Sequence, residues 1–347
     1  MQDTPYPSLG KVVLKAFAKV NLYLDVLEAR PDGFHDIVTL FSSITLHDTI
    51  TVEPTDGPTD FQYRYDPSMH NPGILQWDAS NALFRVLREV EQFLGRSVGS
   101  FRLHLEKRIP PQSGLGGASA DAAAFLRFLA QRFSIPPAAT KKMALATGSD
   151  VPFQLHGGVA LGKGRGEYLD FLPDLPSLPL LLVQPPFSFS TRRMYQHIDA
   201  LRFEEWQNEE VVEHVEDFEE IPHSEERALS EELEEWENGG GEDWHPVDEV
   251  RDLFEDLSRQ SSALTFNDFE QVASELFPEY EAFQQSLREV VSPSILLKSM
   301  TGSGSAHFVL FRENTPREDL QHWASFFQNR GCWVNLCALK GREEPHA

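Results

Sequence analysis

The chain of 347 residues is long enough for two domains, and a hydrophobic fraction of 41% is sufficient for buried cores. A formal net charge of −24 at pH 7, without any basic stripe, excludes a general nucleic-acid binder, because phosphates require cationic partners. No apolar run approaches the ~18 residues of a membrane-spanning helix, and the first residues lack the basic and apolar regions of an export signal.

These features predict a cytoplasmic protein without nucleic-acid or membrane partners, and they leave the oligomeric state open. The two cysteines, Cys332 and Cys337, lie five residues apart on an apparent strand. Their side chains are therefore expected on opposite faces, which excludes an intrachain disulfide between them.

The acidity is concentrated in one segment. Between Phe203 and Leu257 there are 23 acidic residues against two basic ones, so the rest of the chain is nearly neutral. A run of this kind typically forms a solvated insertion, and a partner-binding role is the alternative.

The first predicted element is a strand that begins at about residue 11. Val20, Leu22 and their neighbours alternate on one face of this strand, which places Lys19 and Asn21 together on the other face. A turn at "PDG" follows. The remaining elements predicted before the proline-rich stretch at Pro173 to Pro179 are strands at 36–54, 61–65 and 100–109, helices at 80–95, 119–133 and 137–150, and a glycine-broken strand pair at 157–172.

The second half begins with a strand at 178–186, followed by the acidic segment. One helix is predicted over 267–290, then a strand at 294–300, the loop "TGSGSA", a strand at 307–313, a helix at 317–331 and a strand at 332–340. The order strand, helix, strand, strand, helix, strand is typical of a ferredoxin-like α+β domain.

A glycine-rich loop, "PPQSGLGGASA" at 110–120, directly precedes a predicted helix. Unpaired amides and the positive end of the helix dipole make such a position suitable for an anion, and glycines let phosphate oxygens approach. The loop is neither a Walker A loop nor a dinucleotide-binding fingerprint, since its spacing fits neither motif. A plain strand-to-helix turn is the alternative.

Five motifs occur in order along the chain: "AKVNLYL", "PDGFHD", "PPQSGLGGASADAA", "TGSDVPF" and "TGSGSAHF". Together they resemble the GHMP small-molecule kinase superfamily, from about Leu14 to about Phe311. The branch they resemble most phosphorylates a cytidine diphosphate sugar alcohol in non-mevalonate isoprenoid biosynthesis.

The resemblance implies a two-domain α+β GHMP kinase fold. Residues 1–175 would form an N-terminal domain of a type shared with a ribosomal protein, and residues 176–347 a ferredoxin-like C-terminal domain with the acidic insertion at about 203–257. The implied activity is ATP-dependent and Mg²⁺-dependent phosphorylation of the 2-hydroxyl of a diphosphocytidyl-methylerythritol substrate.

The resemblance also implies roles for individual residues. Asp150 would take or orient the hydroxyl proton, and Lys19 would stabilise the charge on the transferred phosphoryl group. The residues expected at ATP are Asn81 and the loop residues Pro110, Pro111, Gln112, Ser113, Gly114, Leu115, Gly116, Gly117, Ala118, Ser119 and Ala120. The residues expected at the sugar-alcohol substrate are Asn21, Phe34, His35, Thr191 and Tyr195.

Two departures from the family pattern affect these expectations. Ala118, Ser119 and Ala120 stand where relatives usually have Gly-Ser-Ser, so Ser119 alone offers a hydroxyl for Mg²⁺ or a phosphate oxygen. Phe34 replaces the usual tyrosine and can stack but not hydrogen-bond. Another alcohol substrate, such as homoserine or mevalonate, is the closest alternative, and a non-catalytic binding protein is a second. His35 favours a cytosine ligand.

Overall fold

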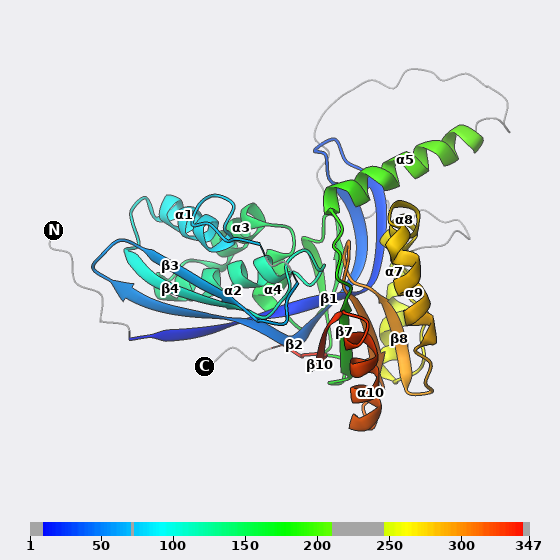
Figure 1. Ribbon diagram of the computed structural model, residues 1–347. Coiled ribbons are helices and arrows are strands. Elements are labelled where there is room, and N and C mark those ends of the chain that lie inside the picture. Colours follow the sequence, from blue (N-terminus) through cyan, green and yellow to red (C-terminus); the bar gives the residue numbers. More distant parts are fainter. Residues whose placement is uncertain (1–9, 71–72, 210–245, 343–347) are drawn as a thin grey trace, which may run out of the picture.

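The computed structural model describes residues 10–70, 73–209 and 246–342. Within these residues a six-stranded sheet occupies the first half of the chain, with strand order β3-β4-β2-β5-β6 and β1 paired to β2. Its helices lie on one face of the sheet (Figure 1). The strands are β1 (Val12–Ala29), β2 (His35–Thr55), β3 (Asp60–Tyr65), β4 (Ser100–Lys107), β5 (Val159–Lys163) and β6 (Tyr168–Leu172), and the helices are α1 (Ala82–Leu94), α2 (Gly117–Arg132), α3 (Pro137–Thr147) and α4 (Val151–His156).

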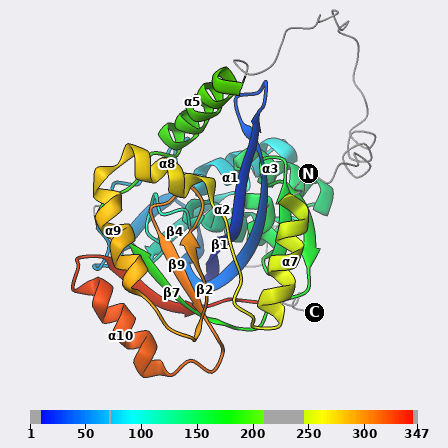
Figure 2. The same ribbon diagram turned by 90° about the vertical axis from the view of Figure 1, so that its right-hand side faces the viewer.

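The second half forms a four-stranded antiparallel sheet in the order β10-β7-β9-β8 within the described residues. This order is the ferredoxin-like arrangement that the sequence predicts, and it confirms the α+β fold. The elements are β7 (Pro179–Gln184), β8 (Ile295–Met300), β9 (His307–Phe311), β10 (Trp333–Ala338), α8 (Asp268–Leu276), α9 (Pro278–Glu289) and α10 (Arg317–Gln328). Helices α8, α9 and α10 lie together over one face of this sheet (Figure 2).

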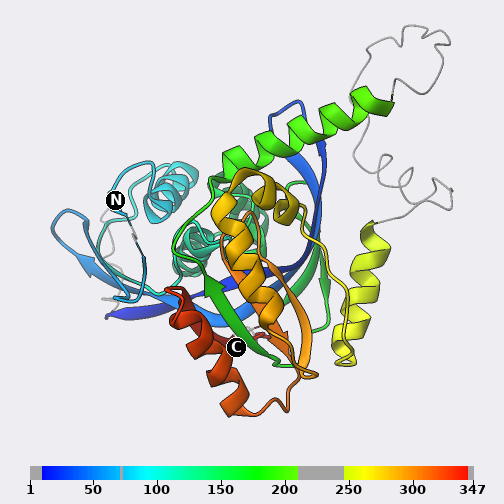
Figure 3. The same cartoon turned by 45° about the vertical axis from the view of Figure 1, so that its right-hand side comes forward.

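The long hairpin of β1 and β2 connects the two halves. It runs from beneath helices α1 to α4 to the tip beside α5 (Thr191–Glu209) (Figures 1 and 3). Its pairing is interrupted by bulges between Phe17 and Lys19 and between Asn21 and Tyr23. Bulges redirect side chains and are common next to active sites, so the strand is irregular on both sides of Lys19 and Asn21.

Two large hydrophobic clusters, beside a small third one around Phe41 and Phe153, hold the described residues together. The larger one joins the first sheet, α1, α2 and one face of β7 and β9, including Leu180 and Phe308. The smaller one lies between the opposite face of the second sheet and α8, α9 and α10, with Phe269 and Phe327 in it. Because the larger cluster continues from one sheet to the other, the two halves share a core instead of meeting only at a surface.

The second half contains most of the differences from the predicted elements. The helix expected over 267–290 is two helices, α8 and α9, because Pro278 begins a new helix after Phe277 in an extended conformation. Helices α4 and α5 were not among the predicted elements.

The acidic stretch lies mostly outside the described residues, which end at Glu209 and resume at residue 246. Its last part forms α7 (Pro246–Ser258), whose Val247, Val250, Leu253 and Leu257 are buried in the larger cluster. The role expected for the stretch as a solvated insertion therefore does not extend to residues 246–257. These residues pack on the body through an apolar helical face.

Candidate active site

Lys19 and Asp150 lie side by side at the bottom of a cleft between the two sheets. Lys19 Nζ is 3.4 Å from Asp150 Oδ2 and donates to Asn21 Oδ1 at 2.6 Å. The Lys19 side chain is only 5% exposed, against 30% for Asp150. A buried ammonium needs such oxygen partners, and the carboxylate is the one of the two that the cleft reaches more easily. The structure thus brings together the two residues expected to be catalytic.

Asn21 connects this pair to its surroundings. Its side-chain amide donates to Thr39 Oγ1 at 2.8 Å, and its backbone N–H donates to Thr301 Oγ1 at 3.0 Å. All three residues are buried. The side chain of Asn21 is therefore fixed from several directions and holds Lys19 in one place.

The glycine loop ends at the N-terminus of α2. Gly116, with φ 69°, occupies the N-cap position and leaves the first amides of the helix without a side-chain cap. A Cβ atom at Gly116 would lie 3.1 Å from Lys19 Cγ, and one at Gly114 would lie 1.9 Å from the Thr301 carbonyl oxygen. The glycines therefore let the loop approach both Lys19 and a second glycine loop, residues 301–306, in addition to keeping its amides open for an anion.

Two hollows meet at this loop. The larger, about 790 Å³, contains Lys19, Asp150 and His35. The smaller, about 290 Å³, is lined by Asn81, Pro110, Pro111 and much of the loop. Residues common to both hollows are Gln112, Gly114, Gly116 and Ser119. An elongated ligand in the smaller hollow would thus reach Lys19 and Asp150 by crossing the glycine loop.

Not every loop residue faces these hollows. Ser113, Gly117 and Ala118 line the smaller one, whereas Leu115 and Ala120 are buried behind the loop. Leu115 contributes through its backbone, because its carbonyl oxygen accepts from Lys19 N at 3.1 Å.

Asn81 lines the smaller hollow and also caps α1. Its Oδ1 accepts from Leu83 N at 2.9 Å, and its Nδ2 donates to the Gln76 carbonyl oxygen at 2.9 Å. Asn81 is therefore the N-cap of α1, and this role leaves the residue on the wall of the hollow.

A buried ionic cluster supports the loop from below. Lys107 Nζ donates to Asp48 and, at 2.7 Å, to Asp121 Oδ2. Asp48 Oδ1 also accepts from Ile109 N at 2.8 Å. Burial, together with the nearby Asp48 carboxylate, raises the pKa of Asp121 to about 8 despite the opposing effect of Lys107. Two carboxyl groups thus share one ammonium, and the cluster ties the end of β4 to α2.

The residues expected at the sugar-alcohol substrate all line the larger hollow, where Asn21 lies beside Lys19. The His35 ring is buried and stacks on Tyr195, with centroids 4.9 Å apart and an interplanar angle of 28°. Phe34 is 48% exposed, and the Arg165 guanidinium covers its ring at 4.5 Å. Burial raises the pKa of Tyr195 to about 12, so its hydroxyl is neutral at physiological pH. The rings of Tyr195 and Phe34 both line the cleft. The ring of His35 already contacts one face of Tyr195, and Arg165 covers one face of Phe34.

Thr191 lies at the start of α5, where it closes one side of the cleft. Its hydroxyl is 2.8 Å from the Ser303 hydroxyl of the second glycine loop. Gln112, on the first glycine loop, is joined to Ser188 at 3.2 Å. Both glycine loops are therefore tied to the segment that leads into α5.

The sequence analysis missed three residues at the site. Asp199 Oδ1 lies 2.6 Å from His35 Nε2, Arg165 lies over Phe34, and Thr301 contacts Asn21. Asp199 follows Tyr195 by four residues, which is one turn of a helix, so recognition of α5 would have indicated it. Arg165 and Thr301 carry no comparable signal, because long-range packing alone brings them to the site.

The comparisons with known proteins agree with this geometry. Residues 81–158 match the family described as GHMP kinases N terminal domain. A Thermotoga petrophila protein named 4-diphosphocytidyl-2-C-methyl-D-erythritol kinase is 35% identical over 87% of this chain and 93% of its own length. A Petrotoga mobilis protein of the same name is 32% identical over 87% of this chain and 99% of its own length.

Solved structures give the same result. A crystal structure of 4-(cytidine 5'-diphospho)-2C-methyl-D-erythritol kinase has a TM-score of 0.65 at 27% identity, over 95% of this chain and 100% of that one. A homoserine kinase from Cytophaga hutchinsonii has a TM-score of 0.61 at 17% identity, over 99% of this chain and 98% of that one, which shows the shared fold alone. Within the described residues, no helix is long and apolar enough to cross a membrane.

Proposed function

The chain belongs to the 4-diphosphocytidyl-2-C-methyl-D-erythritol kinases of the GHMP superfamily, and from this premise we propose that its cleft transfers the γ-phosphoryl group of ATP to the 2-hydroxyl of a diphosphocytidyl-methylerythritol. This reaction would serve the synthesis of isoprenoid precursors. The observation that carries the proposal is the buried Lys19 beside Asp150, at the place where two hollows meet across a glycine loop.

ATP fits the smaller hollow and the loop. The adenosine would lie near Asn81 and the prolines Pro110 and Pro111, and the phosphates would extend along the uncapped amides at the start of α2. Backbone N–H groups and the helix dipole would neutralise part of the phosphate charge. The terminal phosphate would then point toward the larger hollow, where Lys19 and Asp150 lie.

The transfer itself requires mainly alignment and charge stabilisation. Asp150, the more exposed member of the pair, would accept or orient the proton of the substrate hydroxyl. Lys19, held by Asn21, would stabilise the negative charge that spreads over the transferred oxygens. The oxygen of the hydroxyl forms the new bond to phosphorus, and the bond to the bridging oxygen of ADP breaks.

Mg²⁺ is the expected companion of ATP. Among the described residues no group of three or more His, Cys, Asp and Glu side chains could hold a metal ion, and Ser119 offers the hydroxyl that lines both hollows. This fits Mg²⁺, which keeps several waters and is commonly bound through substrate phosphates. When bound, it would neutralise phosphate charge, and Ser119 would be its ligand from the loop.

The cytidine end of the substrate would lie at His35 and Tyr195, with Phe34 at the entrance. An aromatic face and a histidine that can hydrogen-bond are suited to a base. Arg165, which now covers Phe34, would move aside when the base enters, whereas Asp199 would keep the His35 ring oriented. This arrangement favours a cytidylyl substrate over homoserine or mevalonate, which present no base. The Lys19–Asp150 pair disfavours a non-catalytic binding protein.

The test is an ADP-release assay with ATP and Mg²⁺ across a panel of alcohols that contains diphosphocytidyl-methylerythritol, homoserine and mevalonate. Turnover restricted to the cytidylyl substrate is the expected result. Turnover of homoserine or mevalonate instead would move the chain to another activity of the superfamily, and ADP release independent of every alcohol would contradict a kinase role.

A further inference from the structure

A single buried hydroxyl connects the catalytic strand to the glycine loop. Thr301 follows β8 and is fully buried. Its Oγ1 accepts from Asn21 N at 3.0 Å and lies 3.4 Å from the Gly114 carbonyl oxygen, to which it donates. The second contact is long for a hydroxyl donor, so the bond to Asn21 is the stronger of the two.

The backbones of the two glycine loops are also in direct contact. Ala306 N donates to the Ser113 carbonyl oxygen at 3.2 Å. A Cβ atom at Gly302 would lie 3.1 Å from Gly114 Cα. With so little space between them, a displacement of one loop must displace the other.

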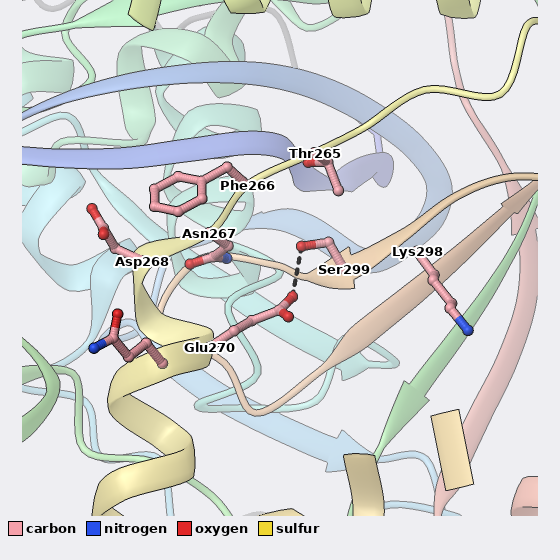
Figure 4. A pocket seen from close by; sticks show the side chains of 8 residues that line it. Thr265, Phe266, Asn267, Asp268, Glu270, Lys298 and Ser299 are labelled. Atoms are coloured by element: carbon pink, nitrogen blue, oxygen red, sulfur yellow. Dashed lines mark hydrogen bonds between the residues drawn. The ribbon is translucent and has the colours of Figure 1, made fainter. Parts of the chain in front are cut away.

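Helix α8 holds Thr301 from the opposite side. Asn267 Nδ2 donates to the carbonyl oxygens of Met300, at 2.9 Å, and Gly302, at 3.1 Å, which are the neighbours of Thr301 in the chain. Glu270 accepts from Met300 N at 2.6 Å and from Ser299 Oγ at 2.7 Å (Figure 4). Thr301 therefore has a defined position before any ligand binds.

The hollow in Figure 4, about 200 Å³, lies along these same residues. Asn267, Glu270 and Lys298 in its wall are engaged with backbone groups of the chain. This hollow therefore lies on the outer side of Asn267 and Glu270, the residues that hold the backbone on either side of Thr301.

We propose that Thr301 is a positioning residue for phosphoryl transfer, an inference that rests on the kinase function proposed above. Its hydroxyl fixes the backbone of Asn21, the side chain of Asn21 holds Lys19, and Lys19 contacts Asp150. The same hydroxyl faces Gly114 in the loop expected to bind the phosphates. Thr301 therefore sets the distance between the bound phosphates and the groups that act on them.

Thr301→Val tests this inference, because valine has nearly the same shape and lacks the hydroxyl. Misalignment of this kind lowers catalysis by up to about a hundredfold, so we expect kcat to fall at least about tenfold while the Kd of ATP changes little. Thr301→Ser, which keeps the hydroxyl, should retain most of the kcat of the wild type. Thr315→Val is the matched control, since Thr315 is also buried and donates only to the Arg312 carbonyl oxygen at 2.7 Å, away from the cleft.

A second measurement does not depend on turnover. Hydrogen exchange of the unliganded protein should show faster exchange of the Asn21 amide in Thr301→Val, but not in Thr301→Ser or Thr315→Val. An unchanged kcat in Thr301→Val, an equal loss in Thr315→Val, or unchanged exchange at Asn21 would each overturn the inference. A wild-type protein that turns over no cytidylyl alcohol would contradict the proposed function, and the exchange experiment would still decide whether Thr301 holds Asn21.

Discussion

Lys19 is almost completely buried at the bottom of the cleft, and its oxygen partners explain how an ammonium group can lie there. Asn21 Oδ1 at 2.6 Å and Asp150 Oδ2 at 3.4 Å compensate for the lost hydration. Removal of either partner changes the position or the charge balance of the ammonium. At the scale of single residues, the account therefore predicts that Lys19 and Asp150 act as a unit.

Asp150→Asn should lower kcat by at least about a hundredfold, the usual effect of losing a positioned general base, with nearly unchanged ATP affinity. Lys19→Ala should affect the same step. Because the two act together, the double variant should lose much less than the product of the two single losses. Steady-state kinetics of the three variants measure this, and near-wild-type kcat in both single variants would contradict the assignment.

The second prediction at the scale of single residues concerns Asp199. Its carboxylate lies 2.6 Å from His35 Nε2 and orients the ring expected to contact the base. Asp199→Ala should raise the KM of the cytidylyl substrate by about tenfold, the scale of one hydrogen bond to a charged group, with little change in kcat. Glu275→Ala is the control, because Glu275 of α8 pairs at 2.8 Å with His197 of α5, the helix that carries Asp199, and does not line the cleft. Equal KM changes in both variants would refute the role of Asp199.

The glycine loop and the strand beside it are the elements that shape the site. The bulges on both sides of Lys19 and Asn21 give β1 its local twist, and the glycines let the loop touch β1 on one side and the second glycine loop on the other. The approach of Gly116 to β1 is to the side chain of Lys19, whereas the approach of Gly114 to the second glycine loop is to backbone atoms, which cannot rotate away as a flexible side chain can.

Gly114→Ala should therefore disrupt the site more than an ordinary substitution. The new Cβ would lie 1.9 Å from the Thr301 carbonyl oxygen, at a φ of +78°. We expect kcat/KM for ATP to fall more than about tenfold, on the scale expected for a displaced catalytic group. Gly99→Ala has a similar positive φ of +93° and nothing within 4 Å, so it reports backbone strain alone. Similar kinetics for the two variants would show that strain, and not the contact with Thr301, controls the loop.

Periodicity and turn residues predicted most of these elements in advance. The cap of α1 at Asn81, its end at Gly95 and the strand pattern of β4 follow from local preferences that the structure retains. The break before α9 is marked in the sequence by Pro278 itself, because a proline disfavours a helical conformation in the residue before it. Helix α7 could not be recognised as part of the core, because its apolar positions lie within a stretch dominated by charge.

At the scale of the whole molecule, the junction between the two halves contains a group of acids around the buried Asp25. Asp25 of β1 lies next to Asp268 of α8, with Arg202 of α5, Glu249 of α7 and Tyr23 nearby. Burial first, and the Asp268 carboxyl second, raise the pKa of Asp25 to about 7. Elements distant in the chain thus meet at a carboxyl group that is protonated well above its ordinary range.

This raised pKa predicts how stability depends on pH. An acid whose pKa is higher in the folded state binds protons on folding. Its contribution to the free energy of unfolding is therefore complete below about pH 4 and is lost as the pH rises through 7. Asp25→Asn should remove that loss and raise the free energy of unfolding at pH 8 by more than about 1.4 kcal/mol, the equivalent of one pKa unit. Urea unfolding of both proteins at pH 5 and pH 8 measures the difference.

Asp66→Asn is the control for this prediction. Hydrogen bonds from Ser68 lower the pKa of Asp66. Asp66 therefore stabilises the folded state above its ordinary pKa, and this stabilisation is lost only on acidification. In Asp66→Asn, the free energy of unfolding should change between pH 5 and pH 8 as much as it does in the wild type. If the free energy of unfolding of Asp25→Asn also changed between pH 5 and pH 8 as much as that of the wild type, the assignment of the pH dependence to Asp25 would be contradicted.

The sequence predicted the general architecture better than the contacts within it. The resemblance carried by the motifs indicated both halves and the meeting of Lys19 with Asp150, and the order of the predicted elements indicated the ferredoxin-like second half. The continuous core between the sheets, the support around Thr301 and the acids at Asp25 depend on contacts between residues more than two hundred positions apart. Single-sequence patterns carry no information about such pairs.

The most direct test of the central claim is the identity of the product. ATP, Mg²⁺ and diphosphocytidyl-methylerythritol are incubated with the wild-type protein and with Asp150→Asn, and the products are followed by phosphorus-31 NMR. The account predicts one new phosphomonoester at the 2-position and an equal amount of ADP, an intact cytidine diphosphate group, and at least about a hundredfold slower formation in the variant. Release of inorganic phosphate without a new ester, or equal rates in the two proteins, would contradict it.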